Sequence, residues 1–398
     1  MTLSENYILD GQLVAELQTS ISDLFYVDRL ETPRPAPQGT VIFIGHLLMQ
    51  DSEAAYDIIA ERWRRLEYTP LLRHHQNQVA LEARPGIIVP TPPNPWINFG
   101  LAVATIASVW LTGSVYECQC MPVTPAHWLA GLPMMLAMMA ILAAHEFGHY
   151  FAAKFHRVHV TLPYFIPLPV ISPVGTLGAF IQLRSPFKTK RQLFDIGIAG
   201  PIAGLVFAIP LIFWGVANSN VHELTREPAG ASVLEGNSIF YLGVKYLIHG
   251  QLLPSFDAYA NLPAAQEFLL LLAGSIPAGG GSDILISSVA FAAWFGLFVT
   301  AMNLLPVGQL DGGHVVYSLI GDKARLLGMV LVGIMVAAGI FWWTGWLVWA
   351  FLTFFIIGVN HPPPLNDLVP LDTGRKIIAW VMIAFFVILF MPNPLQPL

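Results

Sequence analysis

The chain has 398 residues, of which 55% are hydrophobic and only 11% are charged. Soluble globular proteins carry roughly 25% charged residues, so the composition indicates a membrane protein. The net charge is -6 and no basic block occurs, so nothing indicates a nucleic-acid partner. Two cysteines, Cys118 and Cys120, are too few for a disulfide framework or for a zinc site built from cysteine, and we interpret them as incidental.

Residues 1–95 have the pattern of a small α/β domain. The segments TVIFIGHLLM (Thr40–Met49) and QVALEARPGIIVP (Gln78–Pro90) are apolar and flank SEAAYDIIAERWRRLEY (Ser52–Tyr68), which has a helical pattern. The first 20 residues lack the basic start and apolar centre of a signal peptide, so we expect this domain in the cytoplasm. The proline-dense stretch PTPPNP (Pro90–Pro95) predicts a linker.

Apolar segments long enough to cross ~30 Å of hydrocarbon begin after the linker. Seven are predicted, at about 97–115, 128–155, 194–217, 284–305, 325–343, 345–360 and 376–392. With the N-terminus inside and the C-terminus outside, every Lys and Arg except Arg226 and Lys245 lies in a cytoplasmic segment, as the positive-inside rule requires. The fifth and sixth spans join at FWWTGW (Phe341–Trp346), which predicts either a tight turn or the kink of one long helix. The expected fold is therefore a polytopic α-helical membrane protein, with domains 1–95 and 96–398.

The second span contains ionisable side chains in MMAILAAHEFGHYFAAKFHRV (Met138–Val158). Each such group costs at least ~2.5 kcal/mol in a spanning helix, which makes it a candidate functional residue. His145 and His149 are four residues apart and therefore share one helix face. With Glu146 they form H-E-x-x-H, in which two histidines bind zinc and the glutamate takes a proton from water. The alternative is a polar network that packs helices together.

A catalytic zinc ion needs a third protein ligand. Four candidates lie beyond the helix end or in the outside loop and are disfavoured: His156, His159, Glu223 and Glu235. In FVTAMNLLPVGQLDGGHVVYSLIG (Phe298–Gly321), Pro306 and Gly308 end the fourth span and Asp311 follows. The second and fourth spans both run inward, so Asp311 is expected at the depth of the two histidines. His314 is an alternative ligand, or makes a polar contact at a helix start.

These two stretches together carry a resemblance to a known family. HEFGHYFAAKFHRV with NLLPVGQLDGG resembles the site-2 proteases, which are intramembrane zinc metalloproteases with H-E-x-x-H on one helix and N-x-x-P-x-x-x-x-D-G on another. The second pattern falls on Asn303, Pro306, Asp311 and Gly312. The resemblance covers roughly residues 128–320, the expected core of the transmembrane domain. A soluble domain precedes the spans, and the outside loop at 218–283 is too short for a PDZ domain. In both respects the chain resembles the branch of the family that has no PDZ domain.

The resemblance implies roles for five residues. His145, His149 and Asp311 would hold one Zn²⁺ per chain, and Glu146 would be the general base. Asn303 would stabilise the oxyanion or position the substrate. It could equally satisfy the carbonyl groups that Pro306 leaves without a donor.

Two further stretches fit this resemblance. PVGTLGAFIQLRSP (Pro173–Pro186) predicts two short strands around Gly175 and Gly178, a membrane-associated hairpin or sheet. In the family such a sheet is thought to bind an extended substrate by strand addition; the alternative is an ordinary cytoplasmic hairpin. The candidate substrate-binding residues are Gly175, Thr176, Gly178 and Ala179. AGPIAG (Ala199–Gly204) places small residues four apart, which favours close helix packing.

The predicted function is an intramembrane zinc endopeptidase that cuts transmembrane segments of membrane proteins near the cytoplasmic face. A metal-binding or transport protein is the alternative, but it would spread polar groups along a pathway. A di-iron lipid hydroxylase would need more histidines. The expected location is the bacterial plasma membrane, and the expected partners are the lipid bilayer and a transmembrane protein substrate. The N-terminal domain is expected to serve a regulator or to be a plain folding unit.

Overall fold

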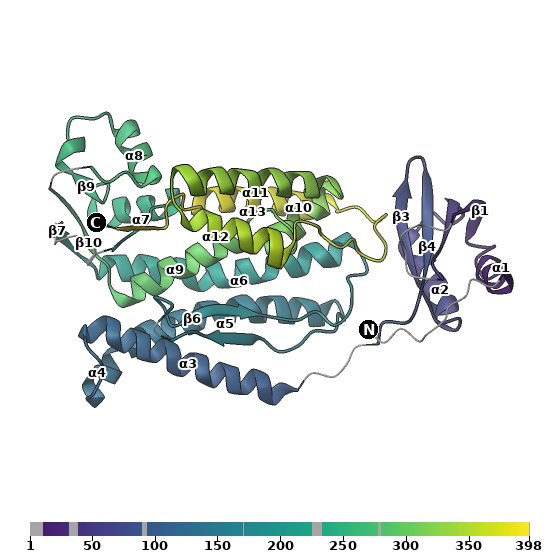
Figure 1. The fold of residues 1–398 in the computed structure, drawn as a ribbon, viewed down its shortest axis with the longest axis horizontal. Helices are drawn as coiled ribbons and strands as arrows, with labels where there is room; N and C mark the ends of the chain where they lie inside the picture. Colours follow the sequence, from purple (N-terminus) through teal and green to yellow (C-terminus); the bar gives the residue numbers. More distant parts are fainter. Residues whose placement is uncertain are drawn as a thin grey trace.

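The structure is a computed structural model that describes residues 11–31, 39–89, 94–169, 171–224, 233–277 and 280–397. A small domain lies at one end of an elongated helical body (Figure 1). Residues 90–93 of the predicted linker lie outside the described residues. Asn94 caps the first long helix, because its side chain accepts a hydrogen bond from the Trp96 N–H.

The N-terminal domain is an antiparallel sheet with two helices. Its elements are α1 (Gly11–Thr19), β1 (Phe25–Glu31), β2 (Val41–Leu47), α2 (Ser52–Arg64), β3 (Tyr68–His75) and β4 (Gln78–Pro85). The strand order is β1-β2-β4-β3, and Phe43, Trp63 and Leu72 lie in its core. The α/β prediction is confirmed, whereas β1 and β3 were not predicted. Pro70 interrupts the pattern of β3, which is at the sheet edge, where proline is tolerated.

Four helices are long and apolar enough to cross a membrane in the part of the chain described. They are α3 (Pro95–Cys118), α4 with α5 (Pro125–Ala130 and Leu132–Phe155), α6 (Lys190–Ala217) and α11 (Lys323–Phe341). Three other predicted spans are helical but shorter: α9 (Ser288–Asn303), α12 (Gly345–Phe351), which continues as the π-helix Leu352–Ile357, and α13 (Thr373–Leu389). These helices indicate an integral membrane protein, and seven spans remain a prediction.

Phe341–Trp346 forms a tight turn rather than a kink. Helix α11 ends at Phe341, and α12 begins at Gly345. The two helices then pack closely, since a Cβ at Gly339 would lie 2.6 Å from the Leu347 side chain. The fifth and sixth predicted spans are therefore separate helices.

Short elements between α6 and α9 gather at the end of the body opposite the N-terminal domain (Figure 1). They are β7 (Asn220–Glu223), β8 (Val233–Glu235), α7 (Ile239–His249), β9 (Ser255–Phe256), the 3₁₀ turn Asp257–Tyr259, α8 (Ala264–Ala273) and β10 (Gly281–Leu285). Strand β8 pairs with the C-terminal β11 (Leu395–Pro397). Lys245 is fully buried here, with its Nζ 3.1 Å from both Glu235 and Asp283.

The predicted hairpin within Pro173–Pro186 is wrong in its pairing. Only one strand, β6 (Thr176–Phe180), lies in that stretch, and it pairs antiparallel with the upstream β5 (Tyr164–Pro167). Gly175 has φ +78°, which ends the extended run before Thr176. The sheet is tied to α3, because the Ser108 hydroxyl donates to the Gly175 carbonyl.

Candidate active site

Helices α5 and α6 approach each other closely where α5 carries its histidines. A Cβ at Gly200 of α6 would lie 2.0 Å from His149 Nε2, far inside contact distance. One turn further along, a Cβ at Gly204 would lie 3.4 Å from His145, which is ordinary contact. The small residues of AGPIAG therefore pack as predicted, and Gly200 in particular provides the space for the His149 ring.

Three side chains converge between α5 and α10 (Asp311–Ile320). His145 Nε2 lies 3.2 Å from His149 Nε2 and 3.4 Å from Asp311 Oδ2. His149 Nε2 lies 3.3 Å from Asp311 Oδ1. Both histidines are buried, and the Asp311 Oδ2 atom is buried without a hydrogen-bond partner. The predicted convergence of these residues is found in the structure.

The separations of the three ligand atoms fit one zinc ion. Zinc binds imidazole nitrogen and carboxylate oxygen at ~2.0–2.2 Å in tetrahedral geometry, so two such ligand atoms are roughly 3.3–3.5 Å apart. The observed separations are 3.2, 3.3 and 3.4 Å. Two imidazoles and one carboxylate leave the fourth tetrahedral position open, which is the arrangement of a catalytic rather than a structural zinc site.

The backbone of α6 fixes the orientation of the His149 ring. His149 Nδ1 lies 2.7 Å from the Ile196 carbonyl oxygen, which can only accept a hydrogen bond. The proton is therefore on Nδ1, and the lone pair of Nε2 faces Asp311. A hydrogen bond of this kind orients metal-binding histidines and selects their tautomer.

Asp311 is held by a compact turn between α9 and α10. The segment 304–310 joins the two helices, and Asp311 is the first residue of α10. A Cβ at Gly312 would lie 1.9 Å from the Leu304 carbonyl oxygen. Only glycine fits at this position, which gives a physical reason for the D-G pair in the motif.

Glu146 and Asn303 line the same cavity as the ligand cluster. This cavity has a volume of about 620 Å³. Glu146 is buried, and its carboxylate accepts a hydrogen bond from the backbone of Ile181. Asn303 ends α9, and its Nδ2 lies 3.4 Å from His145 Nε2. The side chain of Asn303 thus faces the ligand cluster.

One wall of the cavity is the chain that follows β6. Residues 179–187 line it, including Ala179 at the end of the strand. The other three candidate substrate-binding residues, Gly175, Thr176 and Gly178, are not among the residues that line the cavity. Substrate binding along β6 remains a prediction, with Ala179 the member nearest to the site.

His314 is not part of the ligand cluster, and it contacts a histidine that sequence reasoning missed. His314 Nδ1 lies 2.6 Å from His361 Nε2, and the His361 ring stacks on Tyr317. Burial, with His314 nearby, lowers the pKa of His361 to about 3, so that ring is neutral near pH 7. The signal in the sequence is weak: a histidine before three prolines, in a loop far from either motif.

The loop that carries His361 is held between the N-terminal domain and the helical body. Its residues 361–363 line the cavity. The Leu365 N–H donates to the Phe187 carbonyl, and the Asp367 N–H donates to the Leu72 carbonyl of β3. Asn366 is fully buried between them, and Arg73 Nη1 donates to the carbonyls of Pro364 and Leu365.

Ion pairs add a second link between the two parts of the molecule. Lys188, just before α6, lies 2.8 Å from Asp57 and 3.7 Å from Glu53 of α2. Both carboxylates are substantially exposed, so each pair contributes at most about 1 kcal/mol. The backbone and arginine contacts of the loop are thus the main connection.

Comparison with known proteins supports the chemistry that this geometry allows. The chain is similar to "Probable zinc metalloprotease EGY1, chloroplastic" of Arabidopsis thaliana, with 29% identity over 268 residues, covering 66% of this chain and 43% of that protein. The Oryza sativa subsp. japonica protein of the same name is 30% identical over 265 residues, covering 66% and 41%. "Probable zinc metalloprotease EGY2, chloroplastic" of Arabidopsis thaliana is 24% identical over 271 residues, covering 66% and 42%.

The chain thus spans about two fifths of the length of these curated relatives. The model of "Peptidase family M50" matches residues 133–341, which is more than half of the chain and contains all three clustered ligands and Glu146. The expected resemblance to the site-2 proteases is thus confirmed at the level of the family, and the chain belongs to peptidase family M50.

Proposed function

We propose that this protein is an intramembrane zinc endopeptidase that cuts transmembrane segments of membrane proteins near the cytoplasmic face. The observation that carries the proposal is the convergence of His145, His149 and Asp311 at zinc-ligand spacing, with Glu146 on the wall of the same cavity. When bound, zinc supplies Lewis acidity that lowers the pKa of a water molecule and polarises a peptide carbonyl.

The residues around the ligand cluster have the other catalytic roles. The buried Glu146 carboxylate is placed to take a proton from the attacking water and to deliver it to the leaving amine. Asn303, with its amide group toward the ligand cluster, is placed to donate a hydrogen bond to the developing oxyanion. The wall at 179–187 supports binding of an extended peptide beside Ala179.

A metal transporter is the weaker candidate. Transport would need polar ligands along a route through the helices. In the described part of the chain, one buried group of metal-ligand residues is found, and the glutamate of the H-E-x-x-H motif lies beside it on the cavity wall.

We place the zinc cluster in the inner leaflet of a bacterial plasma membrane. Lys154 is exposed near the end of α5 and serves as the interfacial anchor. His149 and His145 are five and nine residues deeper along the helix, which corresponds to ~7 to 14 Å. Water then reaches the cavity from the cytoplasmic side.

This depth predicts which substrates are cut. A helix shields its carbonyl groups, and opening several residues in lipid costs several kcal/mol. Good substrates should therefore contain Gly, Pro, Asn or Ser in the inner third of their span. Replacing those residues with leucine should slow cleavage in proteoliposomes while the substrate still co-purifies with Glu146→Gln enzyme. Equal cleavage of the leucine variants would contradict the need to unwind the substrate.

The orientation is tested with the two cysteines, which the seven-span topology places outside. After reduction by a membrane-impermeant phosphine, an impermeant maleimide should label Cys118 and Cys120 in intact cells. Labelling that appears only once the membrane is opened would reverse the topology. The double serine variant provides the background.

We propose that the N-terminal domain holds the 361–367 loop in place and so shapes the cavity mouth. Arg73→Ala removes charged hydrogen bonds, each contributing roughly 1.5–3 kcal/mol. The amides of Leu365 and Asp367 should then exchange with solvent at least about tenfold faster, and cleavage should slow with zinc content unchanged. Arg29→Ala removes an exposed pair with Glu31 in the same domain and should have neither effect. Unchanged exchange in Arg73→Ala would contradict the proposal.

A further inference from the structure

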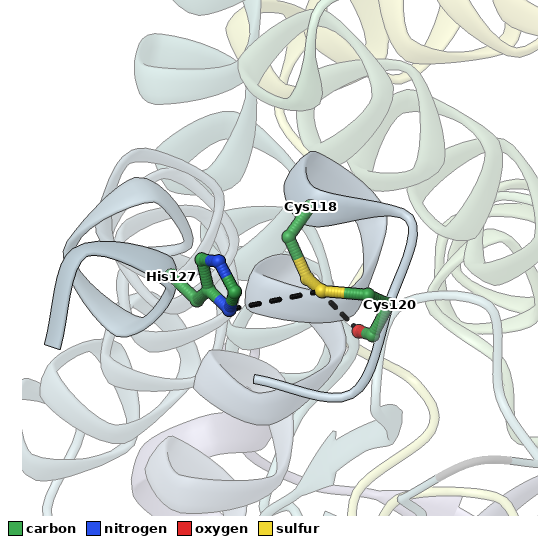
Figure 2. A group of neighbouring side chains, drawn as sticks. All are labelled: Cys118, Cys120 and His127. Atoms are coloured by element: carbon green, nitrogen blue, oxygen red, sulfur yellow. Dashed lines mark hydrogen bonds between the residues drawn. A yellow bond between two sulfur atoms is a disulfide. The ribbon is translucent and has the colours of Figure 1, made fainter. Parts of the chain in front are cut away.

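A second group of metal-ligand side chains lies at the far end of α3, away from the catalytic cavity. Cys118 ends α3, Cys120 follows the turn, and His127 is on α4 (Figure 2). One ligand atom from each residue lies within 4.8 Å of the others. Helix α5 begins at Leu132, close to this group, and His145 lies thirteen residues further along the helix. At 1.5 Å per residue, the two groups are about 20 Å apart.

The fold around the group orients its members toward one another. Gln119 adopts a left-handed conformation, with φ +50°, which turns the chain so that Cys120 lies beside Cys118. Thr124 caps α4 by accepting from the His127 N–H. Helices α3 and α4 are held together by the Trp110 indole, which donates to the Trp128 carbonyl at 2.6 Å.

The imidazole of His127 presents its unprotonated nitrogen to the sulfur atoms. His127 Nδ1 lies 3.7 Å from Cys120 Sγ. The Val123 N–H donates to the same Nδ1 at 3.4 Å, so this nitrogen carries a lone pair and the proton is on Nε2. Two sulfur atoms and an imidazole lone pair are the ligand types that zinc and related borderline-soft cations prefer.

In the structure the two sulfur atoms are bonded as a disulfide (Figure 2). This disulfide closes a loop with only one intervening residue, whereas disulfides stabilise proteins mainly by closing long loops. The group is also accessible, because Cys120 is exposed and the other two residues are half-buried. A small solvent-accessible disulfide of this kind can exchange with thiols.

We propose that Cys118, Cys120 and His127 form a redox-gated site for a zinc-type divalent cation. In the reduced form, two thiolates and His127 Nδ1 bind the cation, which replaces the Val123 N–H at Nδ1, and water completes the tetrahedron. A disulfide oxidant, such as an oxidised thiol pair, closes the site. The two thiolates give two electrons and form the S–S bond of the protein. The S–S bond of the oxidant accepts these electrons and breaks, and its two sulfur atoms take two protons to become thiols. The cation then leaves.

Cobalt(II) distinguishes this site from the catalytic one. Thiolate ligands give Co²⁺ an intense near-ultraviolet charge-transfer absorption, which a site of two histidines and an aspartate lacks. Full-length wild-type protein in detergent, reduced with a phosphine and titrated with Co²⁺, should show this band, with a final intensity that corresponds to one thiolate-bound Co²⁺ per chain. Oxidation with glutathione disulfide should abolish it.

Variants make the assignment specific. Reduced Cys120→Ser should lose the tight site, and His127→Ala should keep thiolate absorption but bind Co²⁺ at least tenfold more weakly. The controls are His149→Ala, which should keep the band, and an unchanged gel-filtration profile for each variant. No band in reduced wild-type protein, or a band of equal affinity and intensity in Cys120→Ser, would overturn the proposal. Neither result depends on proteolytic activity.

Discussion

Glu146→Gln is expected to abolish proteolysis while the protein still binds one zinc ion per chain. Glu146 lies on the cavity wall outside the ligand cluster, so its loss removes the proton acceptor and leaves the ligands in place. The cleavage rate should fall by roughly 10²–10⁴-fold, the usual contribution of a general base. Zinc content, measured by mass spectrometry of purified protein, should be unchanged.

The ligand variants should behave in the opposite way. His149→Ala and Asp311→Ala each remove one of three protein ligands and should lose most of the zinc together with activity. Stoichiometric zinc in Asp311→Ala would point to another third ligand, with His314 the nearest alternative along the chain. Loss of zinc in Glu146→Gln would mean that the glutamate binds the metal directly.

Gly200→Ala is expected to inactivate the protein although residue 200 is not a ligand. The new Cβ would lie 2.0 Å from His149 Nε2, so the ring must move by more than 1 Å or α6 must shift away from α5. Such overpacking costs ~1–3 kcal/mol of stability. A ligand displaced by about 1 Å can reduce catalysis by roughly 10²-fold. Zinc affinity and cleavage rate should therefore both fall.

The matched control is Gly204→Ala, one turn further along α6. Its Cβ would lie 3.4 Å from His145, in ordinary contact, so zinc binding should change little. Competition with a chromogenic chelator measures both affinities. Equal zinc affinity in the two variants would contradict the idea that Gly200 provides space for the ligand ring.

The central residues of the site could be predicted because their chemistry is local in the sequence. The two histidines are one helical turn apart, so spacing puts them on one helix face, and Asp311 follows a proline-marked helix end, which makes it a candidate third ligand. Their common depth followed from the direction of two spans. The N-terminal strands and helix with clear apolar patterns were predicted for the same reason.

Other features depend on contacts between distant segments. His361 reaches His314 across 47 positions because the N-terminal domain and the α6 start hold its loop, and no local pattern encodes that. The partner of β6 is β5, because strand pairing depends on how both strands pack along α3. Gly200 is necessary because a side chain there would clash with His149 on the neighbouring helix. The sequence does not specify where these two helices cross.

The most direct test of the central claim is to map where membrane proteins are cut. Membranes from cells with wild-type protein and with Glu146→Gln are compared by mass spectrometry of newly formed N-termini. The expected new termini lie in the cytoplasmic third of transmembrane helices and are absent from Glu146→Gln membranes. New termini in soluble domains or in the outer leaflet, or termini that persist in Glu146→Gln, would contradict an inner-leaflet intramembrane protease.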